Sequence, residues 1–122
     1  MRYKSAMAGI AKYKSRPASP MNQWVRDALE AANMTQQALA DALSRVEGLG
    51  TYDRSMVHKM TGSRRVRGEE AVAISQITGH PLPESEDDLE FEQMYRKLSQ
   101  ENRTVIRTIV RNLLGGQKDR GQ

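Results

Sequence analysis

Apolar residues recur at the spacing of one helix face from Met21 onward. Ser19, just before this pattern, supplies a side-chain oxygen that suits a helix N-cap, and Pro20 suits the first helical position. Asn33 tolerates the left-handed backbone conformation that ends many helices. The pattern therefore predicts a helix over residues 20–32. Its apolar face consists of Met21, Trp24, Val25, Ala28, Leu29 and Ala32.

Three shorter helices are predicted to follow. Thr35 is the expected N-cap of the first, which can extend to Val46. Asp53 is the expected N-cap of the second. The third is expected over Glu69–Thr78, with Gly79 as its C-terminal stop. Their apolar faces consist of Ala38, Leu39, Ala42 and Leu43, then Met56, Val57 and Met60, and then Ala71, Ile74 and Ile77.

Two further helices are predicted in the C-terminal third. Residues 84–92 contain six acidic side chains, which suit the positive end of a helix dipole better than they suit a metal site. The apolar face of that helix includes Phe91, Met94, Tyr95 and Leu98. Ser99 is expected to cap a last helix that ends near Leu114, because two glycines follow. The apolar stripe of the last helix consists of Val105, Ile106, Ile109, Val110, Leu113 and Leu114.

No segment has the alternating apolar and polar positions of a β-strand, so the fold class is predicted to be all-α. The chain has 122 residues, which fits a single domain. Aromatic residues make up only 5%, so we expect a core of Leu, Ile, Val, Met and Ala. No apolar run approaches the ~20 residues of a membrane span, and no secretory signal begins the chain. We therefore expect a cytoplasmic protein without a membrane partner.

Composition argues against an enzyme. The absence of cysteine excludes disulfides, thiolate metal sites and cysteine nucleophiles. The two histidines, His58 and His80, have no nucleophile or ligand group near them in sequence. The glycines of Gly48-Leu49-Gly50 lack the Lys-Ser/Thr sequel of a phosphate loop. We expect no catalytic residue, no cofactor and no metal.

Positive charge is concentrated at the N-terminus. The net charge is +4, and residues 1–20 contain five basic residues and no acid. Residues 21–83 contain seven basic and seven acidic residues, and residues 84–122 contain seven basic and eight acidic ones. The basic segment is either an arm that contacts nucleic-acid phosphates or enters a minor groove, or a solvated tail. Net charge alone is therefore weak support for a nucleic-acid partner.

The order of the motifs is more specific. An N-capped helix opens with Met34-Thr35-Gln36-Gln37-Ala38-Leu39-Ala40, a short helix carries Arg54-Ser55-Met56-Val57-His58-Lys59-Met60, and Ser63-Arg64-Arg65-Val66 follows. This order resembles the lambda-repressor-like family of helix-turn-helix regulators, also called Cro-type or XRE-type, over about residues 21–83. The resemblance implies double-stranded DNA as the partner.

The resemblance also implies which residues contact DNA. The short helix would be the recognition helix in the major groove, and its base-contacting residues would be Arg54, Ser55, His58 and Lys59. An arginine bonded to guanine through two hydrogen bonds contributes about 1–3 kcal/mol of discrimination. Phosphate contacts are expected from Thr35, Gln36, Tyr52, Arg64, Arg65 and Arg67.

One departure from the family pattern affects these assignments. Nine residues, 44–52, separate Leu43 from Asp53, whereas the family turn has three or four. Either the preceding helix is longer or the loop is enlarged, with Leu49 placed to cover the core. Taken singly, each contact residue also has an ordinary structural role, such as N-capping for Thr35. The DNA interpretation therefore depends on their joint order.

The wide apolar stripe of the last helix predicts an interface. Its six residues are expected to form a symmetric homodimer, which would present paired recognition helices to an inverted-repeat operator. The alternative is that the stripe packs on the chain's own core. The expected organisation is a basic arm over 1–19, a helix-turn-helix domain over 20–83, a dimerising helical region over 84–115 and a disordered tail over 116–122.

The function predicted from these features is that of a dimeric transcriptional repressor of bacterial or phage origin, located at the nucleoid, which blocks a promoter by occupying it. A protein antagonist is a possible further partner, because little chain remains for a ligand domain. An antitoxin or a restriction-modification controller would use the same DNA-binding domain. An adaptor that binds proteins and no DNA is the alternative from another class.

Overall fold

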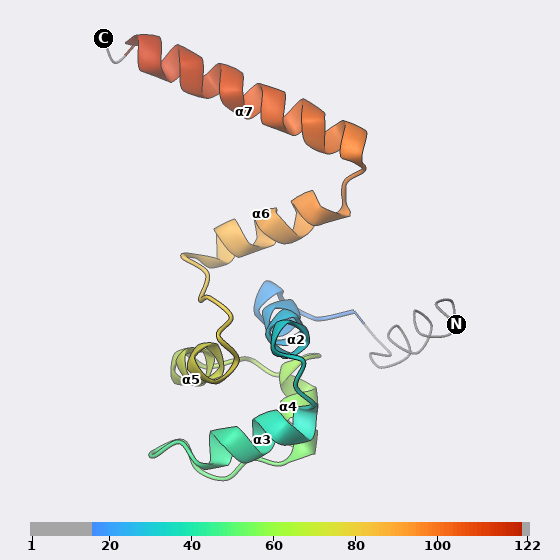
Figure 1. Cartoon of the computed structure of the whole chain (residues 1–122), viewed down its shortest axis with the longest axis vertical. Coiled ribbons are helices and arrows are strands. Elements are labelled where there is room, and N and C mark those ends of the chain that lie inside the picture. Colours follow the sequence, from blue (N-terminus) through green and yellow to red (C-terminus); the bar gives the residue numbers. More distant parts are fainter. Residues whose placement is uncertain (1–15, 121–122) are drawn as a thin grey trace. The chain divides into compact units, whose positions relative to one another are not determined.

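The computed structural model describes residues 16–120, and the side chains of residues 16–116. Within these residues the fold is all-α, as predicted, and contains no strand. The chain divides into two compact units, a first unit of residues 1–89 and a second unit of residues 90–122. Its helices are α2 (Pro20–Ala32), α3 (Gln36–Ser44), α4 (Arg54–Met60), α5 (Gly68–Thr78), α6 (Glu86–Lys97) and α7 (Gln100–Arg120) (Figure 1).

Both predicted ends of α2 are confirmed. The Ser19 hydroxyl accepts the backbone N–H of Asn22 at 3.2 Å, which satisfies one of the free donors of the first turn. Asn33 ends the helix with φ 53° and ψ 43°, in the left-handed region. The expected basic arm, residues 1–19, lies mostly outside the described residues. At its end, the backbone N–H of Ala18 donates to the carbonyl of Gly62 at 2.7 Å, so the chain is already attached to the first unit before α2 begins.

The caps of the next helices also agree with the predictions. Thr35 Oγ1 accepts the N–H of Ala38 at 3.0 Å at the start of α3, and Asp53 Oδ1 accepts the N–H of Met56 at 2.8 Å at the start of α4. Gly79 follows α5 with φ 77°, a conformation that disfavours any residue with a Cβ. Local hydrogen bonding thus defines the ends of all three helices.

The segment between α3 and α4 is an enlarged loop and not a longer helix. α3 ends at Ser44, and the loop of residues 45–53 leads to α4. The Ser44 hydroxyl donates to the carbonyl of Tyr52 at 3.1 Å and accepts its N–H at 2.8 Å, which joins the two ends of the loop. Leu49 is partly buried against the core, as expected. The extra residues therefore form an ordered excursion that returns the chain to the end of α3.

The core of the first unit lies among α2, α3, α4 and α5, where contacts join α3 to α4, α2 to α5 and α3 to α5. Trp24 is 1% exposed, and its indole N–H donates to the carbonyl of Pro81 at 3.0 Å, so its one polar atom is satisfied. Aliphatic side chains supply most of the remaining buried surface, as the low aromatic content predicts. The fully buried ones include Val25, Leu29, Leu39, Leu43, Val57, Met60 and Ile74.

The boundary between the units falls inside α6. Ser85 caps this helix by accepting the N–H of Asp88 at 3.0 Å, which fits the acid-rich first turn. Leu89, in the same turn region, is 5% exposed and belongs to the core of the first unit. The first unit thus ends at Leu89, six residues after the boundary expected at residue 83, and Leu89 is the residue of α6 that belongs to its core.

The last helix is longer than predicted. Ser99 caps α7 by accepting the N–H of Asn102 at 3.2 Å, as expected. The helix then continues through Gly115 and Gly116 to Arg120, so the predicted end near Leu114 is wrong. Of the tail expected over 116–122, residues 116–120 are helical, and residues 121–122 lie outside the described residues. A glycine inside a helix costs only about 1 kcal/mol relative to alanine, which does not end a helix by itself. Within residues 16–120, none of the helices combines the length and apolar character needed to cross a bilayer.

Candidate nucleic-acid interface

The four residues expected to contact bases form one exposed surface of α4. Arg54, Ser55, His58 and Lys59 are all exposed, whereas Val57 and Met60 of the same helix are fully buried. In a helix, positions i, i+1, i+4 and i+5 share one side, and here that side is opposite the buried one. These four residues therefore form one continuous polar and cationic face on the seven-residue helix α4.

The N-terminus of α3 lies next to this face. Thr35 is exposed and Gln36 is 8% exposed. The N-cap bond uses the N–H of Ala38, so the helix geometry leaves the N–H groups of Gln36 and Gln37 without intrahelical acceptors. Such N–H groups at the positive end of a helix dipole suit an anionic oxygen.

A surface hollow of about 270 Å³ joins the two elements. Its lining consists of Thr35, Gln36 and Gln37 from the start of α3 and of Arg54 and His58 from α4. This volume is slightly below the roughly 300–1,000 Å³ of pockets that enclose small-molecule ligands. Thus two predicted phosphate contacts and two predicted base contacts lie around one depression.

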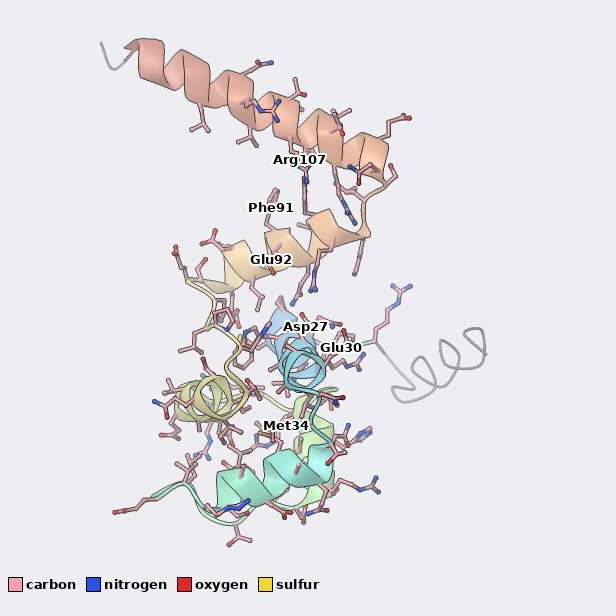
Figure 2. All side chains as sticks on the ribbon, in the orientation of Figure 1. Asp27, Glu30, Met34, Phe91, Glu92 and Arg107 are labelled. Atoms are coloured by element: carbon pink, nitrogen blue, oxygen red, sulfur yellow. The ribbon has the colours of Figure 1, made fainter. Side chains whose placement is uncertain are left out.

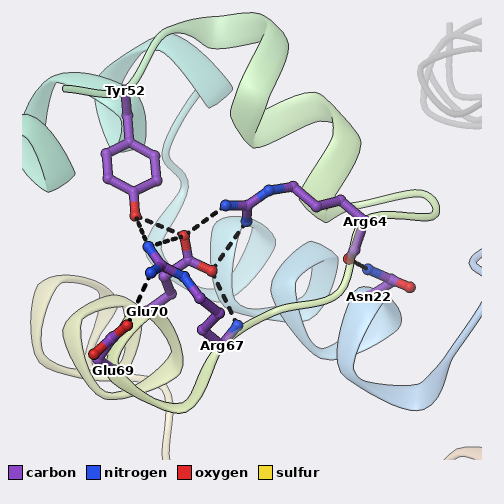
Figure 3. A network of polar contacts seen from close by, with 6 residues as sticks. All are labelled: Asn22, Tyr52, Arg64, Arg67, Glu69 and Glu70. Carbon is purple, nitrogen blue, oxygen red and sulfur yellow. Dashed lines mark hydrogen bonds and ion pairs between the residues drawn. The ribbon is translucent and has the colours of Figure 1, made fainter. Parts of the chain in front are cut away.

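A buried carboxylate organises the loop after α4 (Figure 3). The Glu70 side chain has no exposed surface. Arg64 donates to both of its oxygens, at 3.0 and 2.9 Å, and Arg67 donates through its backbone N–H at 2.9 Å and its guanidinium at 3.3 Å. The Tyr52 hydroxyl donates to Oε2 at 2.6 Å. Glu70 is therefore saturated with donors from three residues.

These donors determine the charge state of Glu70. Burial alone would raise the pKa of its carboxyl group, since burial disfavours the charged form. The hydrogen bonds from Arg64, Tyr52 and Arg67 outweigh burial and lower the pKa from 4.5 to about 2. Conversely, burial and the bond to Glu70 raise the pKa of Tyr52 above 10.0. Glu70 is thus an anion at neutral pH, and Tyr52 is a neutral donor.

This network engages the side chains of three residues that were expected to contact phosphate. Tyr52 is only 5% exposed and its hydroxyl is bonded to Glu70, so it is not placed to reach a phosphate. Arg64 directs both terminal nitrogens to Glu70, and Arg67 is paired with Glu69 and Glu70. Both arginines thus neutralise the buried carboxylate of Glu70. Arg65, by contrast, is exposed and takes no part in the network.

The C-terminal end of α4 is also held by polar contacts with α2. Asn22 is 1% exposed, and its amide donates to the carbonyls of Met60 and Arg64, both at 2.7 Å. Arg26 Nε donates to the carbonyl of Thr61 at 2.7 Å. At the other end of α4, just before its N-cap, the Tyr52–Glu70 bond joins the chain to α5. The exposed face of α4 is therefore held in place at both ends.

Sequence reasoning missed the residues that hold this face. Glu70 lies three positions after Arg67, and this spacing is typical of a capping contact. The sequence therefore did contain a signal for the bond between the Arg67 backbone and Glu70. Its pairing with Arg64 and Tyr52 has no local signature. The burial of Asn22 on an otherwise apolar helix likewise became evident only with its two carbonyl partners in place.

The residues predicted to form the dimer interface lie on α7, within the second unit. Ile106 is partly exposed, and the other five are exposed by 45–68%. The described residues contain no cluster of His, Asp and Glu side chains that would hold a metal ion.

Comparisons of the chain with protein-family models, with curated proteins and with solved structures found no match.

Proposed function

We propose that the protein is a sequence-specific double-stranded DNA-binding transcriptional regulator in which α3 and α4 act as a helix-turn-helix. In this proposal α4 is the recognition helix and enters the major groove. An α-helix has the width that this groove accepts, and seven residues extend for about 10 Å along it. The fold would then be lambda-repressor-like, with an enlarged turn.

The observation that carries the proposal is the shared hollow at the start of α3 and on α4. Arg54 and His58 line it together with Thr35 and Gln36. A protein that reads DNA needs side chains directed at base edges and, beside them, donors for the phosphate backbone that set the register. This hollow combines both kinds of group on one surface.

Each group has a defined part in the proposed complex. Arg54 donates two hydrogen bonds to O6 and N7 of a guanine, and His58 and Lys59 contact neighbouring bases or phosphates. The N–H groups of Gln36 and Gln37 bind a phosphate oxygen at the start of α3. Arg65 adds a phosphate contact that does not read sequence.

The enlarged loop is compatible with this arrangement. Ser44 and Tyr52 join its two ends, and Tyr52 is in turn bonded to Glu70 on α5. The additional residues, beyond those of an ordinary helix-turn-helix turn, therefore form a loop whose two ends are joined at Ser44 and Tyr52. The bonds at the two ends of α4 and its buried side chains Val57 and Met60 hold this helix against the first unit with the longer loop in place.

The biological output proposed is repression, in which the bound protein occupies a promoter and excludes polymerase. Repression by occupancy needs no ligand-binding or catalytic site, and it needs only affinity for one operator that exceeds affinity for other DNA. Footprinting on the DNA upstream of the protein's own gene is the first test of whether such an operator exists.

A binding selection tests the proposal directly. Full-length protein is used to select sequences from random double-stranded DNA, and affinities for an enriched and a scrambled duplex are then measured by fluorescence anisotropy. Double substitution of Arg54→Ala and Ser55→Ala should reduce the preference for the enriched duplex about 5- to 160-fold, since each arginine–guanine pair contributes about 1–3 kcal/mol. Arg111→Ala removes the same charge from an exposed position on α7 and should change neither affinity by more than about twofold.

Three outcomes bear on the proposal in different ways. Enrichment of one motif, lost in the Arg54/Ser55 variant, would support it. Enrichment that the variant retains would show that α4 is not the reading element. The absence of any enriched sequence would contradict DNA recognition and favour the adaptor alternative.

A further inference from the structure

The second unit does not bury a core of its own. None of the side chains of residues 90–116 is buried, although α7 is 21 residues long and most of the 12-residue helix α6 belongs to this unit. Isolated helices are marginally stable in water, and most of their stability in proteins comes from packing an amphipathic face. The second unit therefore needs a covering surface.

The surface to be covered is large and apolar. Seven large hydrophobic residues are 45–68% exposed. Their exposed surface sums to roughly 700 Å² per copy, which is of the order of the ~800 Å² that each partner contributes to a standard interface. Two lie on α6 and five on α7. They are Phe91, Met94, Val105, Ile109, Val110, Leu113 and Leu114.

The apolar residues of α7 form two adjacent rows along the helix. A contact with one neighbouring helix needs only one such row. The first row is 106, 110 and 114, and the second is 105, 109 and 113, with four residues between successive members. Together the rows cover about half of the circumference of the helix. A stripe of this width fits a helix that packs between two others.

One neighbour of α7 is α6 of the same chain. The guanidinium carbons of Arg103 and Arg107 lie 5.9 Å from the centroid of the Tyr95 ring, and Arg103 also donates to the carbonyl of Arg96 at 2.6 Å. Phe91 points from α6 toward α7, and Arg107 points from α7 toward α6 (Figure 2). Phe91 is nevertheless 54% exposed, so α7 of the same chain does not cover it.

The described residues of the first unit, 16–89, do not offer a comparable apolar surface. Among residues 16–89, only Val72 and Leu82 are large hydrophobic side chains with substantial exposure, each 44%. An apolar surface of matching size is present on a second copy of the second unit. Two identical patches related by a two-fold axis cover each other, which is the most common way in which proteins form dimers.

We propose that the second unit is a homodimerisation module in which α6 and α7 of two copies cover each other's apolar faces in a four-helix arrangement. Row 105, 109, 113 of one copy packs on the other copy, and Phe91 and Met94 belong to the same interface. This interaction does not require DNA. If the proposed function also holds, the dimer carries two α4 helices to two half-sites.

Mass measurement in solution tests the proposal without DNA. Light scattering or sedimentation equilibrium of the full chain should give twice the chain mass of 13.8 kDa at micromolar concentration. Ile109→Asp should weaken dimerisation on the order of 100-fold or more, because each dimer would bury two unpaired carboxylates. Thr108→Asp places the same charge on the polar side of α7 and should remain dimeric. Met94→Asp should act like Ile109→Asp, since it tests the contribution of α6.

Folding of the variants can be followed separately. Trp24 is the single tryptophan and is buried in the first unit, so an unchanged emission maximum shows that the first unit is folded. Single cysteines provide a second measurement that introduces no charge, because the chain has none of its own. Val105→Cys, Ile109→Cys or Leu113→Cys should give intermolecular cross-links with a short bismaleimide, and Thr108→Cys should give few.

The contradicting outcomes are distinct. A wild-type mass of 13.8 kDa at all concentrations would overturn the proposal, because no second copy would then cover the patch. A dimer that persists in both Ile109→Asp and Met94→Asp would place the interface elsewhere. Equal cross-linking at positions 108 and 109 would also contradict it. None of these results depends on DNA binding, so the proposed function is tested separately.

Discussion

Replacing Glu70 by glutamine isolates the contribution of the buried carboxylate charge. Glutamine has almost the same shape as the protonated carboxyl group, so the variant resembles wild-type protein in which Glu70 has been neutralised. It cannot accept all of the bonds that Arg64, Arg67 and Tyr52 now donate. We expect Glu70→Gln to fold at neutral pH with a lower free energy of unfolding.

The magnitude follows from the pKa. The pKa of the Glu70 carboxyl group is about 2 in the folded chain against 4.5 ordinarily, and at about 1.4 kcal/mol for each pH unit this difference corresponds to about 3.5 kcal/mol at neutral pH. The side chains of Arg64 and Arg67 are 29% and 50% exposed, so water screens part of this interaction. We therefore expect the variant to lose about 2 kcal/mol at pH 7.

The pH dependence has a definite sign. A carboxyl group with a lowered pKa in the folded state stabilises the protein above its unfolded pKa, and this stabilisation is lost as the pH falls from 4.5 toward 2. Glutamine does not titrate. The difference between wild type and Glu70→Gln should therefore be largest at pH 7 and fall to less than half of that value by pH 3.

Urea unfolding followed by Trp24 fluorescence at pH 7, 5 and 3 measures this difference. A loss of about 2 kcal/mol would move the midpoint by about 1 M urea or more. The matched control is Glu69→Gln, whose carboxylate is 61% exposed and forms one surface ion pair with Arg67 at 3.0 Å. It should change the free energy of unfolding by less than about 0.5 kcal/mol. Equal stability of Glu70→Gln and Glu69→Gln at pH 7, or a difference from wild type that does not depend on pH, would refute the reasoning.

Three further predictions concern other features of the first unit. Asn22→Ala removes a buried amide that donates to two carbonyls, and should cost about 2–3 kcal/mol in urea unfolding; a cost below 1 kcal/mol would mean that water replaces both bonds. Gly79→Ala should lower the free energy of unfolding by about 1 kcal/mol because the φ of Gly79 is 77°, whereas Gly68→Ala in the first turn of α5 should be neutral or stabilising. Thermal melts that rank the two variants the other way would contradict this. In the proposed DNA complex, Arg65→Ala should reduce the slope of log affinity against log salt by about 1 and leave the stability unchanged; an unchanged slope would exclude a phosphate contact.

The secondary structure could largely be predicted because its signals are local. Ser19, Thr35 and Asp53 each accept an N–H three residues later, and Asn33 and Gly79 end helices by their own backbone preferences. Such contacts are determined within a few residues of sequence. The local prediction that was wrong concerns a helix end, at Leu114, where the competing cost of a helical glycine is only about 1 kcal/mol. For the helix after Thr35, the structure has the enlarged loop and not the extension to Val46.

The candidate site was predicted only in part, for a related reason. Helical periodicity determines that Arg54, Ser55, His58 and Lys59 share a face, and the sequence order placed Thr35 and Gln36 at the start of the preceding helix. Whether a given arginine or tyrosine remains accessible is not a local property. Tyr52 is bonded to a carboxylate 18 residues away, and this contact removes it from the surface.

The sequence by itself therefore determined the all-α class, the helix caps, the exposed polar face of α4 and the apolar stripe of α7, since each depends on periodicity or on contacts within one turn. Only the tertiary structure decided that Glu70 engages Arg64, Arg67 and Tyr52, and that Asn22 holds the end of α4. The physical reason is that a charged or amide group is buried only where donors and acceptors from several segments meet it. The composition of any one segment does not show which donors and acceptors from other segments will surround its polar groups.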